Sequence, residues 1–197
     1  MPERRVRRFS RTERALHWTH ASAFFVLLGT GLVLYLPQLS ERVARRPLVK
    51  DVHLYTALAW VIAVAMLVVV GNRRGLFRTI RELESLDGED ARWLLGRGGR
   101  AGRFNAGQKL NAIVTASFAV LFGVSGFLLW YGERDARFRG PNALVLHDGL
   151  MYLSLVLVLG HLYLSLIHPA TRHALSGMTR GWVDEDWARR HHPRWWI

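Results

Sequence analysis

Four long apolar runs alternate with polar, basic segments along the chain. Each run is close to the ~20 residues that a membrane-spanning helix needs. Because backbone polar groups cannot bond to water inside a bilayer, runs of this length predict helices. The pattern predicts an all-α integral membrane protein, a four-helix transmembrane bundle in one domain over residues 1–197. The expected spans are about 17–36, 52–71, 110–131 and 143–167.

The polar segments differ in how many Lys and Arg residues they carry. Basic residues collect on the cytoplasmic side of a membrane protein. Residues 1–14, 72–109 and those after 168 carry 6, 9 and 5 of the 27, whereas 37–51 and 132–142 carry 4 and 3. We therefore expect a multi-pass protein of the bacterial inner membrane, with both termini and the long middle segment cytoplasmic. That middle segment predicts a short amphipathic surface helix and then a Gly- and Arg-rich turn.

Composition narrows the chemistry that the chain can perform. Half of the 197 residues are hydrophobic, yet the net charge is +12. In a soluble domain this charge would indicate nucleic acid binding, but here the basic residues lie between apolar runs, so nucleic acid is not an expected partner. The chain has no cysteine. This excludes disulfides, c-type haem attachment, iron–sulfur ligation and thiolate catalysis within it.

The fourth run has a histidine at each end of the stretch HDGLMYLSLVLVLGH. His147 and His161 are 14 residues apart, so in an α-helix they lie on nearly one face, about 21 Å apart along the axis. That is most of the roughly 30 Å hydrocarbon core of a bilayer. With the expected topology, His53 joins His147 near the outer surface and His17 joins His161 near the cytoplasmic surface. Facing imidazoles suit bis-axial ligation of iron, so the pattern predicts two haems at two depths.

Alternatives remain open for these and the other histidines. A single membrane histidine is more often a packing residue than a ligand, and it is the matched depths that favour ligation. His20 lies one turn after His17 and competes with it for the cytoplasmic haem. Glycines of the first and third runs suit either a flat macrocycle or close helix packing. The polar-tail histidines, expected to be mostly solvated or to contact partners, are His168, His173, His191 and His192.

The stretch FNAGQK meets the third run at the expected cytoplasmic interface. Asn105 and Gln108 each offer a donor and an acceptor, which suits a quinone carbonyl and its hydroquinone hydroxyl, and Gly107 permits close backbone approach. Equally, asparagine commonly caps helices, and the residues alone do not separate the two roles of Asn105. Arg14 and Lys109 are candidates either to pair with haem propionates or to anchor their helices at the lipid headgroups.

Five motifs stand out: RALHWTH at 14–20, RFNAGQKLN at 103–111, LHDG at 146–149, GHLYLSLIHP at 160–169 and GWVDEDWARRHHPRWW at 181–196. Together they resemble the cytochrome b gamma subunit of membrane-bound formate dehydrogenases, over nearly the whole chain. The Asn-Ala-Gly-Gln-Lys stretch and the Trp-Ala-Arg-Arg-His-His-Pro tail are the most specific parts. Four spans with spaced histidines also occur in the cytochromes b of hydrogenases and thiosulfate reductases.

The resemblance implies a set of ligands. His53 and His147 would ligate an outer haem b, and His17 and His161 a haem b on the cytoplasmic side. Menaquinone or ubiquinone would accept electrons beside the inner haem. The implied quinone-site residues are Asn105, Gly107 and Gln108.

The resemblance also implies a function and partners. The chain would carry electrons from a periplasmic iron–sulfur beta subunit through two bis-histidine haems and reduce quinone at the cytoplasmic side. Formate oxidation would belong to the catalytic alpha subunit, and membrane lipid would surround the chain. Three alternatives stay open. They are the same device serving another dehydrogenase such as a Ni-Fe hydrogenase, a stand-alone quinone-reducing cytochrome b, and a haem-free anchor or transporter.

Overall fold

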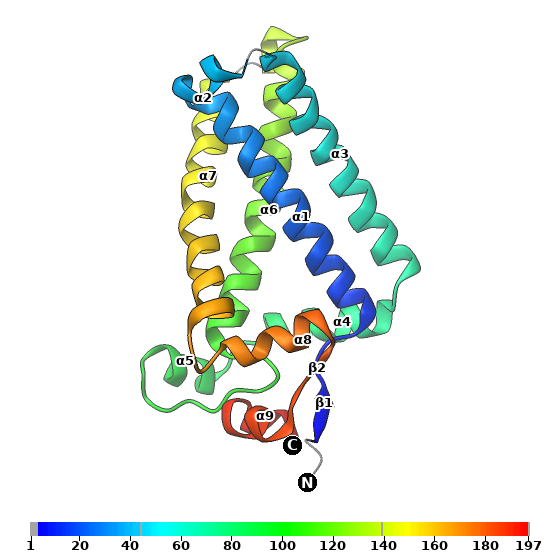
Figure 1. Cartoon of the computed structure of the whole chain (residues 1–197), viewed down its shortest axis with the longest axis vertical. Coiled ribbons are helices and arrows are strands. Elements are labelled where there is room, and N and C mark those ends of the chain that lie inside the picture. The colour runs from blue at the N-terminus through cyan, green and yellow to red at the C-terminus, as the bar shows by residue number, and fades with distance from the viewer. Residues whose placement is uncertain (1–3, 44, 139, 197) are drawn as a thin grey trace. The chain divides into compact units, whose positions relative to one another are not determined.

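Long helices dominate the computed structural model of the chain, which describes residues 4–43, 45–138 and 140–196 (Figure 1). Four of them are long and apolar enough to cross a membrane, which confirms the predicted all-α architecture with four spans. The expected single domain over 1–197 stays a prediction, and residues 1–3, 44, 139 and 197 lie outside the description. The four helices are α1 (Arg11–Tyr35), α3 (Arg46–Val70), α6 (Ala106–Gly132) and α7 (Pro141–Leu162).

The long helices begin two to six residues before the apolar runs, because their first turns are polar. Ser10 caps α1 through a capping box in which its hydroxyl accepts from the Glu13 N–H. A proline opens α3 and α7, where its missing N–H costs no helical hydrogen bond. Hydropathy alone locates the apolar stretch, whereas these caps set the ends of the helices.

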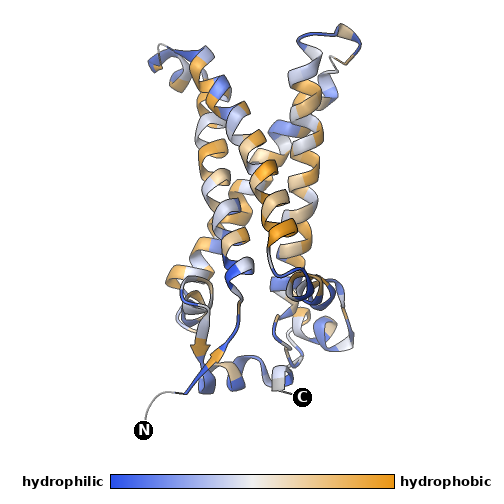
Figure 2. Ribbon diagram, turned by 90° about the vertical axis from the view of Figure 1, so that its right-hand side faces the viewer, coloured by the Kyte–Doolittle hydropathy of each residue, from blue (hydrophilic) through white to orange (hydrophobic). Residues whose placement is uncertain are grey.

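The shorter elements carry the polar residues of the chain, while apolar residues follow the long helices (Figure 2). The amphipathic helix predicted in the middle segment is α4, and a second short helix, α5, follows it. The expected Gly- and Arg-rich turn comes next, with Gly96 and Gly98 at positive φ. The short helices are α2 (Pro37–Arg42), α4 (Arg73–Glu84), α5 (Gly88–Leu94), α8 (Leu175–Thr179) and α9 (Glu185–His191). Single turns are η1 (Ala136–Phe138), η2 (Tyr163–Ile167), η3 (Arg172–Ala174) and η4 (Pro193–Trp196).

The chain separates into two compact units, one of which is Phe9–Phe77. In this unit α1 and α3 pack along each other as an antiparallel pair (Figure 1). The start of α1 meets the end of α3, where the Asn72 N–H donates to Thr12 Oγ1 at 3.1 Å. A Cβ on Gly71 would lie 2.3 Å from the Thr12 methyl, so only glycine allows this approach. No residue of α1 or α3 is buried, as expected for helices whose apolar surface faces lipid.

The other unit contains the helix pair α6 and α7. It also contains a small polar segment with its own core, formed by residues 4–8, 78–105 and 168–196. Two strands, β1 (Arg5–Arg7) and β2 (Trp182–Asp184), pair antiparallel and bring the N-terminal residues to the C-terminal tail. Behind them Val183, Trp187 and Ala188 form a buried apolar cluster. The basic N-terminal residues are therefore part of a folded segment.

Trp187→Ala is expected to open this segment. The Trp187 side chain is 5% exposed, and its indole N–H donates to the Ala170 carbonyl at 3.0 Å. Its removal should lower the opening free energy of the β2 amides by about 3–5 kcal/mol, measured by native-state hydrogen exchange. Trp182, which is 46% exposed in the same strand, provides the control. Trp182→Ala should cost under about 1 kcal/mol, and equal losses in both variants would contradict the assignment of the core.

Candidate functional site

His53 is held by a threonine hydroxyl within the α1–α3 pair. Thr30 Oγ1 lies 2.8 Å from His53 Nδ1 and 2.7 Å from the Val26 carbonyl oxygen. When the hydroxyl donates its one proton to the backbone carbonyl, it accepts from the ring. That arrangement places the proton of the imidazole on Nδ1 and the lone pair on Nε2. Beside the ring, a Cβ on Gly31 would lie 3.6 Å from His53 Cε1.

His147 is held in the same manner within the α6–α7 pair. Ser125 Oγ lies 2.9 Å from His147 Nδ1 and donates to the Leu121 carbonyl at 2.7 Å. A Cβ on Gly126 would lie 3.4 Å from His147 Cε1. In both pairs a hydroxyl–glycine dipeptide on the first helix faces a histidine on the second. The same arrangement places the lone pair of this ring on Nε2.

The other two predicted ligands lie at a different depth in each pair. His17 precedes Thr30, the contact of His53, by 13 residues on α1, which is roughly 20 Å of helix. His161 follows His147 by 14 residues on α7, and the π-helical turn η2 begins directly after that helix. Each pair thus holds two histidines at two well-separated levels, which agrees with the spacing argument. The pairing of His53 with His147, and of His17 with His161, joins the two units and stays a prediction.

His20, the rival candidate on α1, packs against two aromatic rings. Its ring stacks on Phe24 at 6.4 Å and lies 5.6 Å from the Trp60 ring of α3. His17 makes an edge contact with its chain neighbour Trp18. The choice of His17 over His20 as the ligand on this helix stays a prediction.

The predicted quinone residues sit in the cap of α6. Asn105 Oδ1 accepts from the Gln108 N–H at 2.9 Å, and Gln108 Oε1 accepts from the Asn105 N–H at 3.2 Å. Gln108 Oε1 also accepts from the Arg8 guanidinium at 3.2 Å. The capping role considered for Asn105 is therefore real. Both side-chain oxygens are engaged, and the two NH₂ groups are what these residues can offer a ligand.

Gly107 and Lys109 have neighbours within the chain that the sequence did not reveal. A Cβ on Gly107 would lie 3.1 Å from the Trp93 indole, so the glycine makes room for that ring of α5. Lys109 Nζ pairs with Asp90 at 2.7 Å and donates to the Ser85 carbonyl, with both charged groups buried. Within the chain, Asp90 and the Ser85 carbonyl are thus the partners of Lys109.

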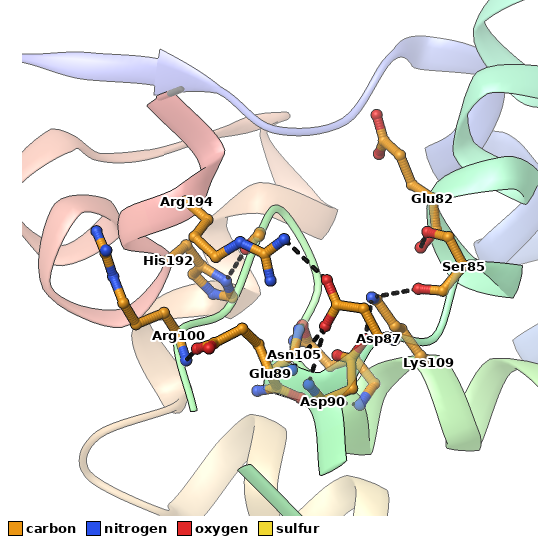
Figure 3. Close-up of polar contacts among 12 residues, drawn as sticks. Glu82, Ser85, Asp87, Glu89, Asp90, Arg100, Asn105, Lys109, His192 and Arg194 are labelled. Carbon is orange, nitrogen blue, oxygen red and sulfur yellow. Dashed lines mark hydrogen bonds and ion pairs between the residues drawn. The ribbon is translucent and has the colours of Figure 1, made fainter. Parts of the chain in front are cut away.

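A cluster of charged side chains surrounds that ion pair (Figure 3). Arg194 donates to Asp87 at 2.8 Å, and this bond lowers the pKa of Asp87 to about 2. A cavity of about 160 Å³ lies here, lined mainly by charged and polar residues, with neither Asn105 nor Gln108 among them. Such a lining suits water and ions better than an apolar quinone ring.

His192 departs from the expectation that the polar-tail histidines are solvated. It is 2% exposed, and its Nδ1–H donates to the Gly102 carbonyl at 2.7 Å. Burial, the nearby charge of Arg8 and that of His191 lower the pKa of His192 to about 3, against the opposing effect of the Gly102 bond. The ring is therefore neutral at physiological pH and acts as a structural link between the tail and the segment before α6.

A family model described as prokaryotic cytochrome b561 matches residues 8–181. The chain belongs to the prokaryotic cytochrome b561 family. Membership makes it a haem-binding membrane protein of electron transport, and haem b is the cofactor of its class. The resemblance inferred from the five motifs is thereby confirmed at the level of the family.

Curated relatives cover nearly the full chain. The chain is 27% identical over 197 residues to the formate dehydrogenase cytochrome b556(fdo) subunit of Escherichia coli K12, spanning 96% of this chain and 90% of the relative. It is 26% identical over 195 residues to the nitrate-inducible cytochrome b556(Fdn) subunit of the same organism, spanning 93% and 87%. It is 24% identical over 208 residues to the formate dehydrogenase cytochrome b556 subunit of Haemophilus influenzae, spanning 98% and 82%.

The residues present in this family member fit haem b. A bis-histidine site needs neutral imidazoles with a lone pair on the nitrogen that faces the iron, and a bond at the other ring nitrogen to fix that form. His53 and His147 meet both conditions through Thr30 and Ser125. The sequence analysis missed these hydroxyls. Their signal was a Thr-Gly or Ser-Gly pair followed by a histidine 23 or 22 residues after the hydroxyl residue.

The polar segment should lose stability in acid because of His192. The folded pKa of about 3 lies below the ordinary 6.5, so the unfolded chain binds a proton first as the pH falls. The contribution of neutral His192 is complete above pH 6.5 and is lost between about 6.5 and 3, at up to about 1.4 kcal/mol per pH unit. Hydrogen exchange of the α9 amides between pH 7 and 4.5, corrected for the intrinsic exchange rate, measures this slope.

His192→Gln should flatten that slope, because glutamine can still donate to the Gly102 carbonyl but does not titrate. His173, an exposed tail histidine, provides the control, and His173→Gln should keep the wild-type slope. An unchanged slope in His192→Gln would show that another group carries the pH dependence.

Proposed function

We propose that this chain is the membrane cytochrome b subunit of a formate dehydrogenase in the bacterial inner membrane, with both termini cytoplasmic. The observation that carries the proposal is the presence of two histidine levels, about 20 Å apart, in each helix pair. Membership of the cytochrome b561 family supports it, and so do near full-length relatives whose names contain formate dehydrogenase. The excess of Lys and Arg in the termini and the middle segment supports the orientation.

Two haems b are proposed, each with two histidine ligands. His53 and His147 hold the outer haem, and His17 and His161 hold the inner one. When bound, the haems supply one-electron redox carriers inside the membrane. With two histidines to hold each haem, the chain would leave no open coordination position for oxygen or substrate, which suits electron transfer.

The proposed electron donor is a partner subunit outside the membrane. The chain has no cysteine to hold an iron–sulfur cluster of its own, and in this proposal an iron–sulfur beta subunit delivers electrons near His53 and His147. Formate oxidation belongs to a catalytic alpha subunit bound to that partner.

The proposed electron acceptor is a quinone, either menaquinone or ubiquinone, on the cytoplasmic side. Asn105 and Gln108 direct NH₂ groups to its carbonyl oxygen, while their own oxygens hold the cap of α6. Gly107 lies between them in the chain and has no side chain, and the Trp93 indole packs against it. Protons for the quinol come from the cytoplasmic side, so electron transfer across the membrane separates charge.

Haem content tests the ligand assignment. Pyridine-haemochrome quantitation of the purified wild-type chain should give two b haems per chain. His53→Ala and His161→Ala should each lose one haem, because each removes one axial ligand, and His20→Ala should lose none. A wild-type chain without haem would contradict the electron-transfer function and favour the alternative of a membrane anchor or transporter. Loss of one haem in His20→Ala, with His17→Ala harmless, would move the inner ligand to His20.

Cap-preserving variants test the quinone site. Asn105→Asp keeps an oxygen that accepts from the Gln108 N–H but removes the NH₂ donor. Loss of one hydrogen bond to the quinone should raise the KM for quinol at least about tenfold, measured as the initial rate of haem reduction by quinol. Haem content should stay at the wild-type level.

Asn105→Ala separates binding from capping in the same assay. It removes the cap as well, which costs about 1 kcal/mol of stability. Asn105→Asp should therefore match Asn105→Ala in KM but keep the wild-type thermal stability. A wild-type KM in Asn105→Asp would assign Asn105 to capping alone.

A further inference from the structure

We infer that Thr30 and Ser125 are positioning residues for the two outer haem ligands. Each hydroxyl fixes the proton of its histidine on Nδ1 and directs Nε2 to the iron. The inference rests on the ligand assignment proposed above, in which His53 and His147 share the outer haem. It adds to that assignment two residues that touch the ligand rings and not the iron.

Both hydroxyls form a hydrogen bond to the backbone in addition to their contact with the imidazole. Thr30 donates to Val26, four residues earlier, and Ser125 donates to Leu121 in the same way. Ser117 and Ser165 make that backbone bond too, to Ile113 and His161. A membrane helix therefore satisfies a serine or threonine without help from a histidine. The hydroxyl already has a hydrogen-bond partner in the backbone. The contact with Nδ1 therefore serves to give the histidine ring a partner.

The two contacts agree in every feature that matters for ligation. The distances to Nδ1 are 2.8 Å and 2.9 Å, and both hydroxyls sit on the helix that precedes the histidine helix. A glycine follows each hydroxyl residue and faces the Cε1 edge of the ring, where a Cβ would already be in contact. The arrangement occurs in each of the two units, which makes a chance packing contact a poor explanation.

The chemical consequence is a stronger donor to the iron. An Nδ1–H that is hydrogen-bonded to an oxygen gives the imidazole more negative character, and this raises the basicity of Nε2. A more basic ligand stabilises ferric iron over ferrous iron. The two hydroxyls are therefore expected to lower the midpoint potential of the outer haem and to keep both rings in the orientation that ligation needs.

The test uses the full-length chain with its native haems and pairs each deletion with a rescue. Thr30→Val and Ser125→Ala remove the acceptor, whereas Thr30→Ser and Ser125→Thr keep a hydroxyl. Ser117→Ala is the matched control, because this residue of α6 makes the same backbone bond and is exposed. Potentiometric titration of the haem absorbance bands gives the midpoint potentials, and pyridine haemochrome gives the haem content.

Thr30→Val and Ser125→Ala should each lower the preference of one haem for the ferric over the ferrous state about tenfold. This raises the midpoint potential of that haem by about 59 mV. Both deletions should affect the same haem, and their effects should add in the double variant. Thr30→Ser, Ser125→Thr and Ser117→Ala should keep wild-type potentials. Unchanged potentials in both deletions, with two haems still bound, would overturn the positioning role and leave the haem ligands intact.

A second readout separates this inference from the proposed function. ¹⁵N NMR of the histidine-labelled chain without haem reports which ring nitrogen carries the proton, since in the haem-bound chain the iron would occupy Nε2. Wild type should show Nδ1–H forms that Thr30→Val and Ser125→Ala convert partly to Nε2–H. If the wild-type chain bound no haem but the two variants showed this change of protonated nitrogen, the positioning role would stand and the proposed function would be wrong. Shifts on two different haems would keep the positioning and overturn the pairing of His53 with His147.

Discussion

Inside the hydrocarbon core of a membrane, every polar group has to find its partner within the protein, because lipid offers none. The long helices meet this constraint for the backbone, and two short relays meet it for the side chains. In each relay a backbone carbonyl accepts a hydrogen bond from a hydroxyl, and the hydroxyl oxygen accepts one from the Nδ1–H of an imidazole. What remains is one basic ring nitrogen at a defined place, and the proposed electron path depends on that nitrogen.

The polar segment meets a related constraint with charges. Arg8 is buried, donates to the Arg103 carbonyl and to Gln108, and stacks over Trp187 at 5.4 Å. Lys109 is buried against Asp90. Buried charges of this kind contribute little net stability when they are paired, but they are costly when one partner is lost, so they favour a single arrangement. The first turn of α6, and the two amide groups proposed to meet quinone, are held in place by these contacts.

The dual use of Asn105 and Gln108 shows why a capping role and a binding role need not compete. Each amide has an oxygen and an NH₂ group, and the cap uses only the oxygens. A helix N-terminus fixed in this way presents the two donors at a constant position. The resemblance pointed to binding and the residue type pointed to capping, and the geometry is compatible with both.

The sequence alone determined the four spans, the amphipathic helix α4 and the two histidine levels, because hydropathy and helical rise are local properties that survive any packing. It also favoured the family, through motifs that are contiguous in the chain. Only the tertiary structure decided the partners of Thr30, Ser125 and Arg8, the pairing of β1 with β2 and the burial of His192. Those contacts join residues 22 to 179 positions apart, such as Arg5 and Asp184 or Thr30 and His53, and no local pattern encodes which distant side chain will arrive. A hydroxyl on a membrane helix looks the same in the sequence whether it meets only its own carbonyl, as Ser117 does, or also an imidazole, because the difference lies in the neighbouring helix.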